Sequence, residues 1–237
     1  MPEANDFGIL HLPVVNSLDG TLSPRLWGEY ELNWILVIAA VLFVIVNLRN
    51  FKDISQALIG CAYRWKSNMT IERSLQQSGA RNVAAAACIL PFCLVMSRFV
   101  ADNDSFLNIC DEKWRSLAVI AVLIGFMIIR RLCYNTGRFQ GIPEEVFRVG
   151  HRCIRNYFIL AAVLIVATAC LLSICGANDL SIKKIVLAEF GLAYLVFLTR
   201  EKQIFDSICH GFRTFLYLCS LEILPVAVTA VILIWVL

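Results

Sequence analysis

Six long apolar runs constrain the fold of this chain more than any other feature of its sequence. A helix that crosses a bilayer needs about 20 mostly apolar residues. The chain is 59% hydrophobic and only 16% charged, a balance outside that of soluble proteins. We therefore predict an all-α polytopic membrane protein, a bundle of six transmembrane helices. The expected helices are 33–48, 82–100, 116–133, 156–175, 182–199 and 212–237.

The distribution of Lys and Arg predicts how the chain is oriented, because cytoplasmic loops carry an excess of these residues. The connections after the first, third and fifth runs hold 15 of them, whereas the other side holds six. Both termini are therefore expected outside the cytoplasm, with 1–32 as an extracytoplasmic tail and 33–237 as the membrane domain. The N-terminus does not resemble a cleavable secretory signal. The first helix is expected to serve as the insertion signal.

A segment near 51–66 is amphipathic, and its apolar residues recur at helical spacing. They are Phe51, Ile54, Leu58, Ala62 and Trp65. Two interpretations stay open: a helix in the plane of the lipid headgroups, or a helix packed beneath the bundle. The fourth and sixth spanning helices are also expected to begin with cytoplasmic extensions. The candidates for contact with anionic lipid or a protein partner are Lys52, Arg64, Lys66, Arg130 and Arg131.

Glu189 and Glu222 are the two acids, of 18, that lie inside apolar runs near mid-depth. A charge there costs roughly 2.5 kcal/mol or more, so such residues usually face the bundle interior. If the last two helices are neighbours, the carboxyls can face each other or share Tyr194 or Tyr217, which would suit a proton relay. Alternatively, each acid only ties helices together, for example through the carbonyl that Pro225 leaves without a donor.

Other residues indicate neither a metal nor an enzyme. His151 with Cys153, and Cys209 with His210, are one or two residues apart on expected helices, so they diverge and cannot converge on one zinc ion. Two histidines alone are a weak basis for a haem. No GxGxxG, P-loop, HExxH or GxSxG motif occurs, and no nucleophile with a base is visible. We expect no catalytic residue, no cofactor and no metal.

The net charge and the positions of the cysteines restrict the expected partners and disulfides. A formal net charge of +3, without a basic soluble domain, argues against a nucleic-acid partner. Eight of the ten cysteines fall in helices or on the cytoplasmic side, where thiols stay reduced. Cys110 and Cys175 approach the outer surface, and whether they pair is left open.

The C-terminal stretch FRTFLYLCSLEILPVAV resembles the end of a family of small multi-pass inner-membrane proteins of Bacteroidota. The similarity is strongest in Phe215, Leu216, Tyr217, Leu218, Cys219, Leu221, Glu222, Ile223, Leu224 and Pro225. That family is catalogued as a domain of unknown function, so the resemblance implies a bacterial cytoplasmic membrane and no particular reaction. It also implies that Tyr217, Glu222 and Pro225 mark the site.

Two functions follow as hypotheses. The first is a small transporter-like protein that handles a lipid-linked or small substrate, or a proton, near Glu222 and Glu189. The second is an accessory or scaffold subunit, bound to a membrane protein or to a second copy of itself, whose buried acids only organise packing. The first predicts a polar cavity at mid-depth, and the second predicts acids paired in a dry interior.

Overall fold

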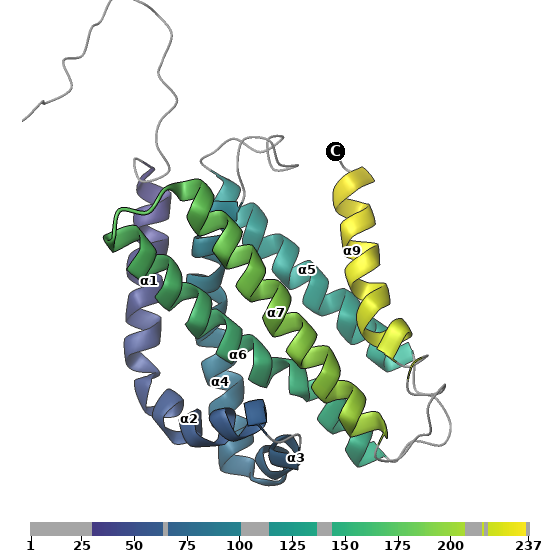
Figure 1. The fold of residues 1–237 in the computed structure, drawn as a ribbon. Helices are drawn as coiled ribbons and strands as arrows, with labels where there is room; N and C mark the ends of the chain where they lie inside the picture. The colour runs from purple at the N-terminus through teal and green to yellow at the C-terminus, as the bar shows by residue number, and fades with distance from the viewer. Residues whose placement is uncertain are drawn as a thin grey trace, which may run out of the picture.

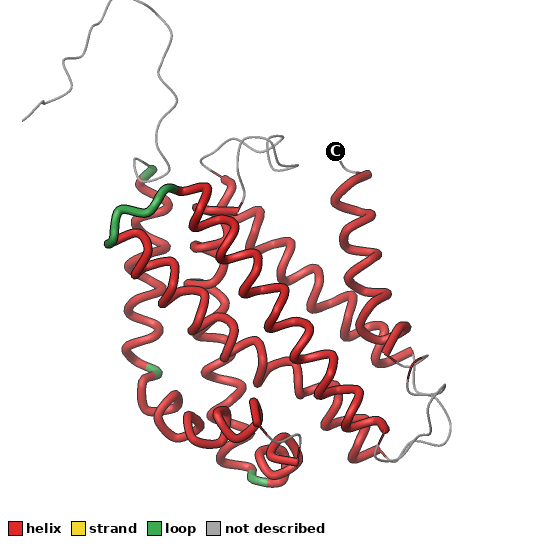
Figure 2. The backbone as a smooth tube through the Cα atoms, viewed as in Figure 1, coloured by secondary structure: helices red, strands yellow, loops and turns green. Residues whose placement is uncertain are grey.

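The computed structural model of the chain describes residues 30–63, 66–100, 114–136, 144–206, 215 and 218–235. Within these ranges the regular structure is helical and contains no strand (Figure 2), which confirms the all-α prediction. The α-helices are α1 (Glu31–Val46), α2 (Leu48–Tyr63), α3 (Lys66–Arg73), α4 (Leu75–Val95), α5 (Arg115–Thr136), α6 (Glu144–Ile174), α7 (Asp179–Asp206) and α9 (Leu224–Trp235). Two π-helical segments, η2 (Met96–Val100) and η5 (Cys219–Ile223), adjoin α4 and α9.

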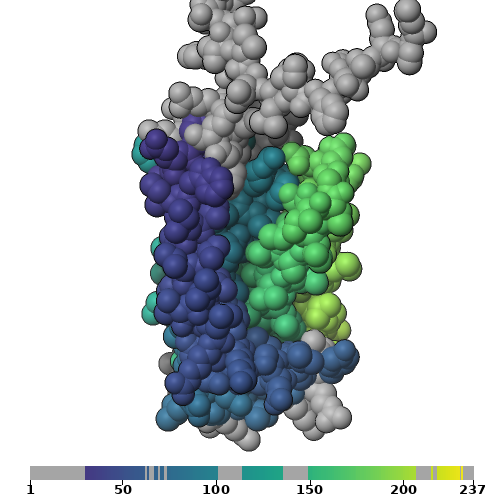
Figure 3. Space-filling view, turned by 90° about the vertical axis from the view of Figure 1, so that its left-hand side faces the viewer, coloured from purple at the N-terminus to yellow at the C-terminus, as the bar shows by residue number. Residues whose placement is uncertain are grey.

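The long helices α1, α4, α5, α6 and α7 run between the same two ends of the molecule (Figure 1). Helices α2 and α3 lie across the lower end in that view, below α1. Figure 3 shows the adjacent face, where α1 covers one side and α2 and α3 close the lower end. The C-terminal helix α9 rises beside α5, against which it packs.

Three helical stretches are long and apolar enough to cross a membrane: Leu75–Val100, Arg115–Asn135 and Val149–Ile174. The pair Glu31–Val46 and Leu48–Cys61, bent by 69°, makes a fourth if it is counted as one span. The described helices thus give three or four candidate spans, fewer than the six that hydropathy alone predicts. The predicted run 182–199 is helical but carries several charges, and the run 212–237 is divided between η5 and α9.

Small residues let α4 and α6 approach closely, as is common between membrane helices. The buried small residues of these two helices include Ala80, Ala84, Ala85, Ala87 and Cys88 on α4, with Ala161, Ala162 and Ala169 on α6. Ile54 and Leu58 of α2 join the same apolar core. The amphipathic segment therefore packs under the bundle, the second of the two interpretations, and it leaves Lys52 exposed.

Asn47 stands at the break between α1 and α2. Its amide donates to the backbone oxygen of Phe43 at 2.8 Å, and its own side-chain oxygen accepts from the Asn50 amide at 3.2 Å. A side-chain amide that bonds the backbone competes with helix continuation, which suits a bend at this position. The amphipathic helix can therefore turn away from α1 and reach the core.

A tight turn makes α6 and α7 antiparallel neighbours. Gly176 has a φ of +71°, and the Ala177 amide donates to the Leu172 oxygen at 3.0 Å, as in the Schellman ending of a helix. At the other end of the pair, a Cβ added at Gly150 would lie 2.9 Å from Cζ of Phe205. Glycine there allows α7 to run close to α6 as far as its last turns. Cys175 is exposed in the turn, whereas Cys110 lies outside the described residues.

Candidate functional site

A buried ion pair joins α5 to the C-terminal segment. Arg130 of α5 is 4% exposed and Glu222 of η5 is 1% exposed. The Arg130 Nε atom lies 3.0 Å from each oxygen of the Glu222 carboxylate, and Nη2 also donates to Oε1. An arginine that contacts a carboxylate through two nitrogens fixes the geometry of both groups and forms one of the stronger hydrogen-bonded pairs.

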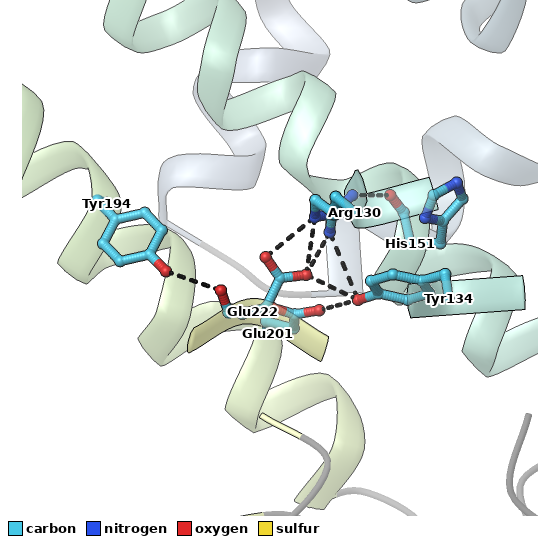
Figure 4. A network of polar contacts seen from close by, with 6 residues as sticks. All are labelled: Arg130, Tyr134, His151, Tyr194, Glu201 and Glu222. Carbon is cyan, nitrogen blue, oxygen red and sulfur yellow. Dashed lines mark hydrogen bonds and ion pairs between the residues drawn. The ribbon is translucent and has the colours of Figure 1, made fainter. Parts of the chain in front are cut away.

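Tyr134 and Glu201 complete the polar cluster. Tyr134 lies four residues after Arg130, so both side chains project from the same face of α5. The Tyr134 hydroxyl is 2.9 Å from Oε1 of Glu222 and 2.5 Å from Oε1 of Glu201. Glu201, near the end of α7, is 0% exposed, and its Oε2 atom has no hydrogen-bond partner among the described residues. Figure 4 shows these four side chains pointing toward one another.

Neighbouring groups hold the cluster in place. Arg130 Nη1 donates to the backbone oxygen of His151 on α6 at 3.0 Å, and the guanidinium lies 4.7 Å from the centre of the Tyr134 ring. Tyr194 of α7 donates to the backbone oxygen of Glu222 at 3.5 Å. Four elements, α5, α6, α7 and η5, therefore meet at this point (Figure 4).

The cluster contains one base and two acids, so both acids cannot be ionised without leaving a buried negative charge. Glu201 lies beyond the predicted span 182–199. Burial raises the pKa of Glu201 well above its usual range, and the nearby Glu222 carboxylate raises that pKa further, whereas Arg130 lowers it. The arrangement therefore favours a neutral Glu201 beside the ion pair of Arg130 and Glu222.

Pro225 accounts for the irregular backbone that presents Glu222. A proline has no amide hydrogen and interrupts the regular pattern of helical hydrogen bonds. The residues just before it, Cys219–Ile223, form a π-helical turn, a local widening that is frequent at functional sites. Glu222 occupies this turn. Its carboxylate bonds to Arg130 and Tyr134, so the proposed contact with the carbonyl freed by Pro225 is not the one observed.

Glu189, the second acid identified in the sequence, lies apart from the cluster. It is half-buried, and its Oε2 atom accepts a hydrogen bond from the Thr168 hydroxyl of α6 at 2.7 Å. Glu222 shares Tyr134 with Glu201 instead, so the pairing of Glu222 with Glu189 is wrong. Tyr194 reaches only the backbone of Glu222.

The cluster also lies nearer to one end of the bundle than the sequence predicted. Glu222 contacts Arg130 and Tyr134 in the last turns of α5, and Arg130 contacts His151 in the first turns of span Val149–Ile174. The expected position at mid-depth is therefore displaced toward the ends of these helices.

The predicted basic surface is only partly formed by exposed residues. Lys52 and Arg131 are exposed, but Arg130 is buried and bonded to Glu222, so its assignment to a lipid-contacting surface is wrong. Arg64 and the side chain of Lys66 lie outside the described residues. Tyr217 lies outside them as well.

Sequence reasoning named Arg130 only as a lipid or partner contact and missed Tyr134 and Glu201, because charge counting assigned Arg130 and Glu201 to cytoplasmic loops. In each case the available signal was the spacing of residues on one face of a helix. Arg130 and Tyr134 are four residues apart at the end of an apolar run. Glu201 is followed at the same face by the buried Ile204 and Phe205.

Metal binding finds no support in the described part of the chain, where no group of three or more His, Cys, Asp or Glu is placed to hold an ion. Cys209 and His210 lie outside that part. His151 contributes its backbone oxygen to Arg130, and its ring centre lies 4.5 Å from that of Tyr134. This role needs no ligand.

The fold and the site define an all-helical, membrane-embedded protein with a buried Arg–Glu–Tyr–Glu cluster. Comparisons of the chain with protein-family models, with curated proteins and with solved structures give no match. The geometry of the cluster is therefore the basis for assigning a function.

Proposed function

We propose that this chain is a small transporter-like membrane protein that handles a proton, or a small or lipid-linked substrate, at the cluster of Arg130, Tyr134, Glu201 and Glu222. A buried charged group in such a protein is costly and usually serves function. One observation carries the proposal: two carboxyls, both at most 1% exposed, are buried with a single cation. A site that holds one acid more than its cations can exchange a proton without losing its ion pair.

The proposed topology has six crossings, with both termini outside the cytoplasm of a bacterial cell. Its support is that the long helices run between the same two ends, and that α1 begins at the end where α9 finishes (Figure 1). The basic connections predicted to be cytoplasmic then lie at the opposite end, as the distribution of Lys and Arg requires. The C-terminal resemblance to inner-membrane proteins of Bacteroidota fits this location.

The exposed Lys52 and Arg131 are proposed to meet anionic lipid headgroups or a membrane-protein partner, including a second copy of the chain. Basic residues near the cytoplasmic leaflet are attracted by its negative surface potential, by about 1 kcal/mol for each residue.

A scaffold or accessory role is the alternative, and a specific observation favours it. Both acids identified in the sequence accept hydrogen bonds from neighbouring helices, Glu222 from Arg130 and Glu189 from Thr168. A buried acid paired in this way, as Glu222 is with Arg130, is what this role predicts, and it can hold a bundle together without taking part in transport.

Proton movement into vesicles separates the two functions. The full chain is reconstituted in phosphatidylethanolamine–phosphatidylglycerol vesicles that contain a pH-sensitive dye, and a pH gradient is imposed. With the wild-type protein, protons should enter faster than they enter protein-free vesicles. Glu222→Gln should lose this additional rate of proton entry although folded protein is still recovered. Glu189→Gln, the matched control, should retain it.

Two results would reject the proton-moving role. In the first, protons would enter wild-type vesicles no faster than protein-free vesicles. In the second, Glu222→Gln would move protons at the wild-type rate. If Glu222→Gln fails only because folded protein is not recovered, the scaffold role is favoured.

A further inference from the structure

The distances between the oxygen atoms around Tyr134 show how many hydrogens must lie between them. The Tyr134 hydroxyl oxygen lies 2.5 Å from Oε1 of Glu201 and 2.9 Å from Oε1 of Glu222. Oxygens this close are held by a hydrogen between them. Two such contacts therefore need two hydrogens, and a tyrosine hydroxyl supplies one. A carboxyl group must supply the other.

The contacts of each acid indicate which carboxyl carries this hydrogen. Both oxygens of Glu222 accept from Arg130, and an ionised carboxylate is the form that only accepts. None of the Arg130 nitrogens bonds to Glu201 among the contacts of the described residues. Glu201 also has a buried Oε2 without a hydrogen-bond partner in the described chain. An uncharged carbonyl oxygen can be left in this position at far lower cost than half of a carboxylate.

We propose that the cluster is a proton-binding site, in which Glu201 carries an exchangeable proton and donates it to the Tyr134 oxygen while Tyr134 donates to Glu222. In this state the cluster is neutral: one guanidinium, one carboxylate and one carboxylic acid. Its role in transport rests on the proposed function, whereas the position of the proton rests on the hydrogen-bond geometry.

Release of the proton changes one further contact. When the Glu201 carboxyl gives its proton to water, the Tyr134 hydrogen turns from Glu222 to the newly charged Glu201. Only the O–H bond of Glu201 breaks, and the cluster gains one negative charge. Glu222 then loses its bond from Tyr134 and keeps those from Arg130, so the hold of α5 on η5 and α9 weakens.

Other titratable groups surround Glu201 and bear on this exchange. They are Arg130 and Tyr134 on α5, His151 and Cys153 on α6, Tyr194 on α7 and Glu222 on η5. Around His151 stand three further cations, Arg131, Arg152 and Arg155. This excess of positive charge around His151 opposes protonation of Glu201, whereas burial and the nearby Glu222 favour it.

Infrared spectroscopy of the full chain in lipid nanodiscs tests the proposal. The expected result at neutral pH is a carbonyl-stretch band of a protonated carboxyl that shifts in D₂O and disappears in Glu201→Gln. The Gln amide can donate to Tyr134 as the acid does, so this variant should fold. Asp206→Asn, an exposed acid of the same helix, is the matched control and should leave the band unchanged.

A second variant tests the partner of the proton. Tyr134→Phe removes the oxygen that accepts from Glu201, so the band should move to higher frequency. The proposal is overturned if the wild type lacks the band at neutral pH, or if Glu201→Gln leaves it unchanged. A band with no proton movement in vesicles would reject the transport role alone, because the proton would then be held without being moved.

Discussion

Glu222 and Glu189 are both acids within apolar runs, yet the structure gives them different surroundings. Glu222 is 1% exposed and meets a buried cation and a tyrosine from α5 and a second acid from α7. Glu189 is half-buried and meets one threonine from the adjacent helix. An acid in an apolar run therefore marks a polar contact, whereas its counter-charges decide whether that contact becomes a site.

The partners of Glu222 and Glu189 should also contribute differently to the stability of the protein. A carboxylate buried with an arginine depends on its partner, because removal of one member leaves the other charge without compensation. A hydrogen bond between membrane helices contributes much less, about 0.6 kcal/mol on average in one well-measured case. Substitutions around Glu222 should therefore have larger effects than those around Glu189.

The largest effect is expected from Arg130→Met. It leaves Glu222 buried without its cation, and the free energy of unfolding should fall by roughly 3–5 kcal/mol. Denaturant unfolding of the purified protein in detergent measures the loss. Arg131→Met, at the exposed neighbouring position, is the control and should change stability by less than about 0.5 kcal/mol. Equal losses in the two variants would contradict burial of the ion pair.

Tyr134→Phe should have the next largest effect. The ring is kept, but the hydroxyl that contacts both Glu201 and Glu222 is lost. One buried oxygen of Glu201 and one of Glu222 then lack this partner, and the free energy of unfolding should fall by about 1–3 kcal/mol. Tyr63→Phe removes a hydroxyl from a side chain that is 76% exposed and should leave thermal unfolding unchanged. An unchanged midpoint for Tyr134→Phe would remove Tyr134 from the cluster.

The dependence of stability on pH should differ between wild type and Glu201→Gln. The pKa of Glu201 is raised in the folded state by burial and by Glu222, from an ordinary value of 4.5. The folded protein therefore keeps a proton that the unfolded chain releases, so this contribution to stability falls as pH rises above 4.5 until the folded pKa is reached. The slope is at most about 1.4 kcal/mol per pH unit for one proton.

Unfolding measured at a series of pH values checks this sign. Glu201→Gln should lose the downward slope of stability with pH. Glu189→Gln, the control from the other region, should keep it. If the wild type instead gained stability with rising pH over the window, and lost that gain in Glu201→Gln, Glu201 would be an ionised acid in the folded state.

The smallest effect is expected from Thr168→Val, which keeps the shape of the side chain and removes its bond to Glu189. The loss should be about 0.6 kcal/mol. Thr199→Val, whose hydroxyl bonds only the local backbone oxygen of Val196 in the exposed part of α7, serves as the control. A loss from Thr168→Val as large as that from Arg130→Met would erase the contrast between the two regions.

Much of the helical architecture was predictable because apolar runs leave few alternatives to helices. Each of the six predicted runs overlaps a described helix, and the segment 51–66 overlaps α2 and the start of α3. The number of spans was less predictable, since only three stretches, or four with the bent pair, are long and apolar enough. The run 182–199 holds Lys183, Lys184 and Glu189, and hydropathy gives no sign of the π-helical turn before Pro225.

The site was predictable only in part. Glu222 was identified because an acid within an apolar run is conspicuous. Its partners were not, because Arg130 and Glu201 follow apolar runs and were counted with the basic connections, where charge is ordinary. Their burial depends on the packing of α5 against η5 and of α6 against α7, which involves residues 92 positions apart. Periodicity within one helix does not contain that information.

A double-mutant cycle on Arg130 and Glu222 measures whether these two side chains form a buried ion pair. The free energies of unfolding of Arg130→Met, Glu222→Leu, the double variant and the wild type are measured under the same conditions. The double variant should be far more stable than the sum of the single losses allows, with a coupling energy of about 2 kcal/mol or more. Single losses that add within about 0.5 kcal/mol would mean that the two side chains do not meet.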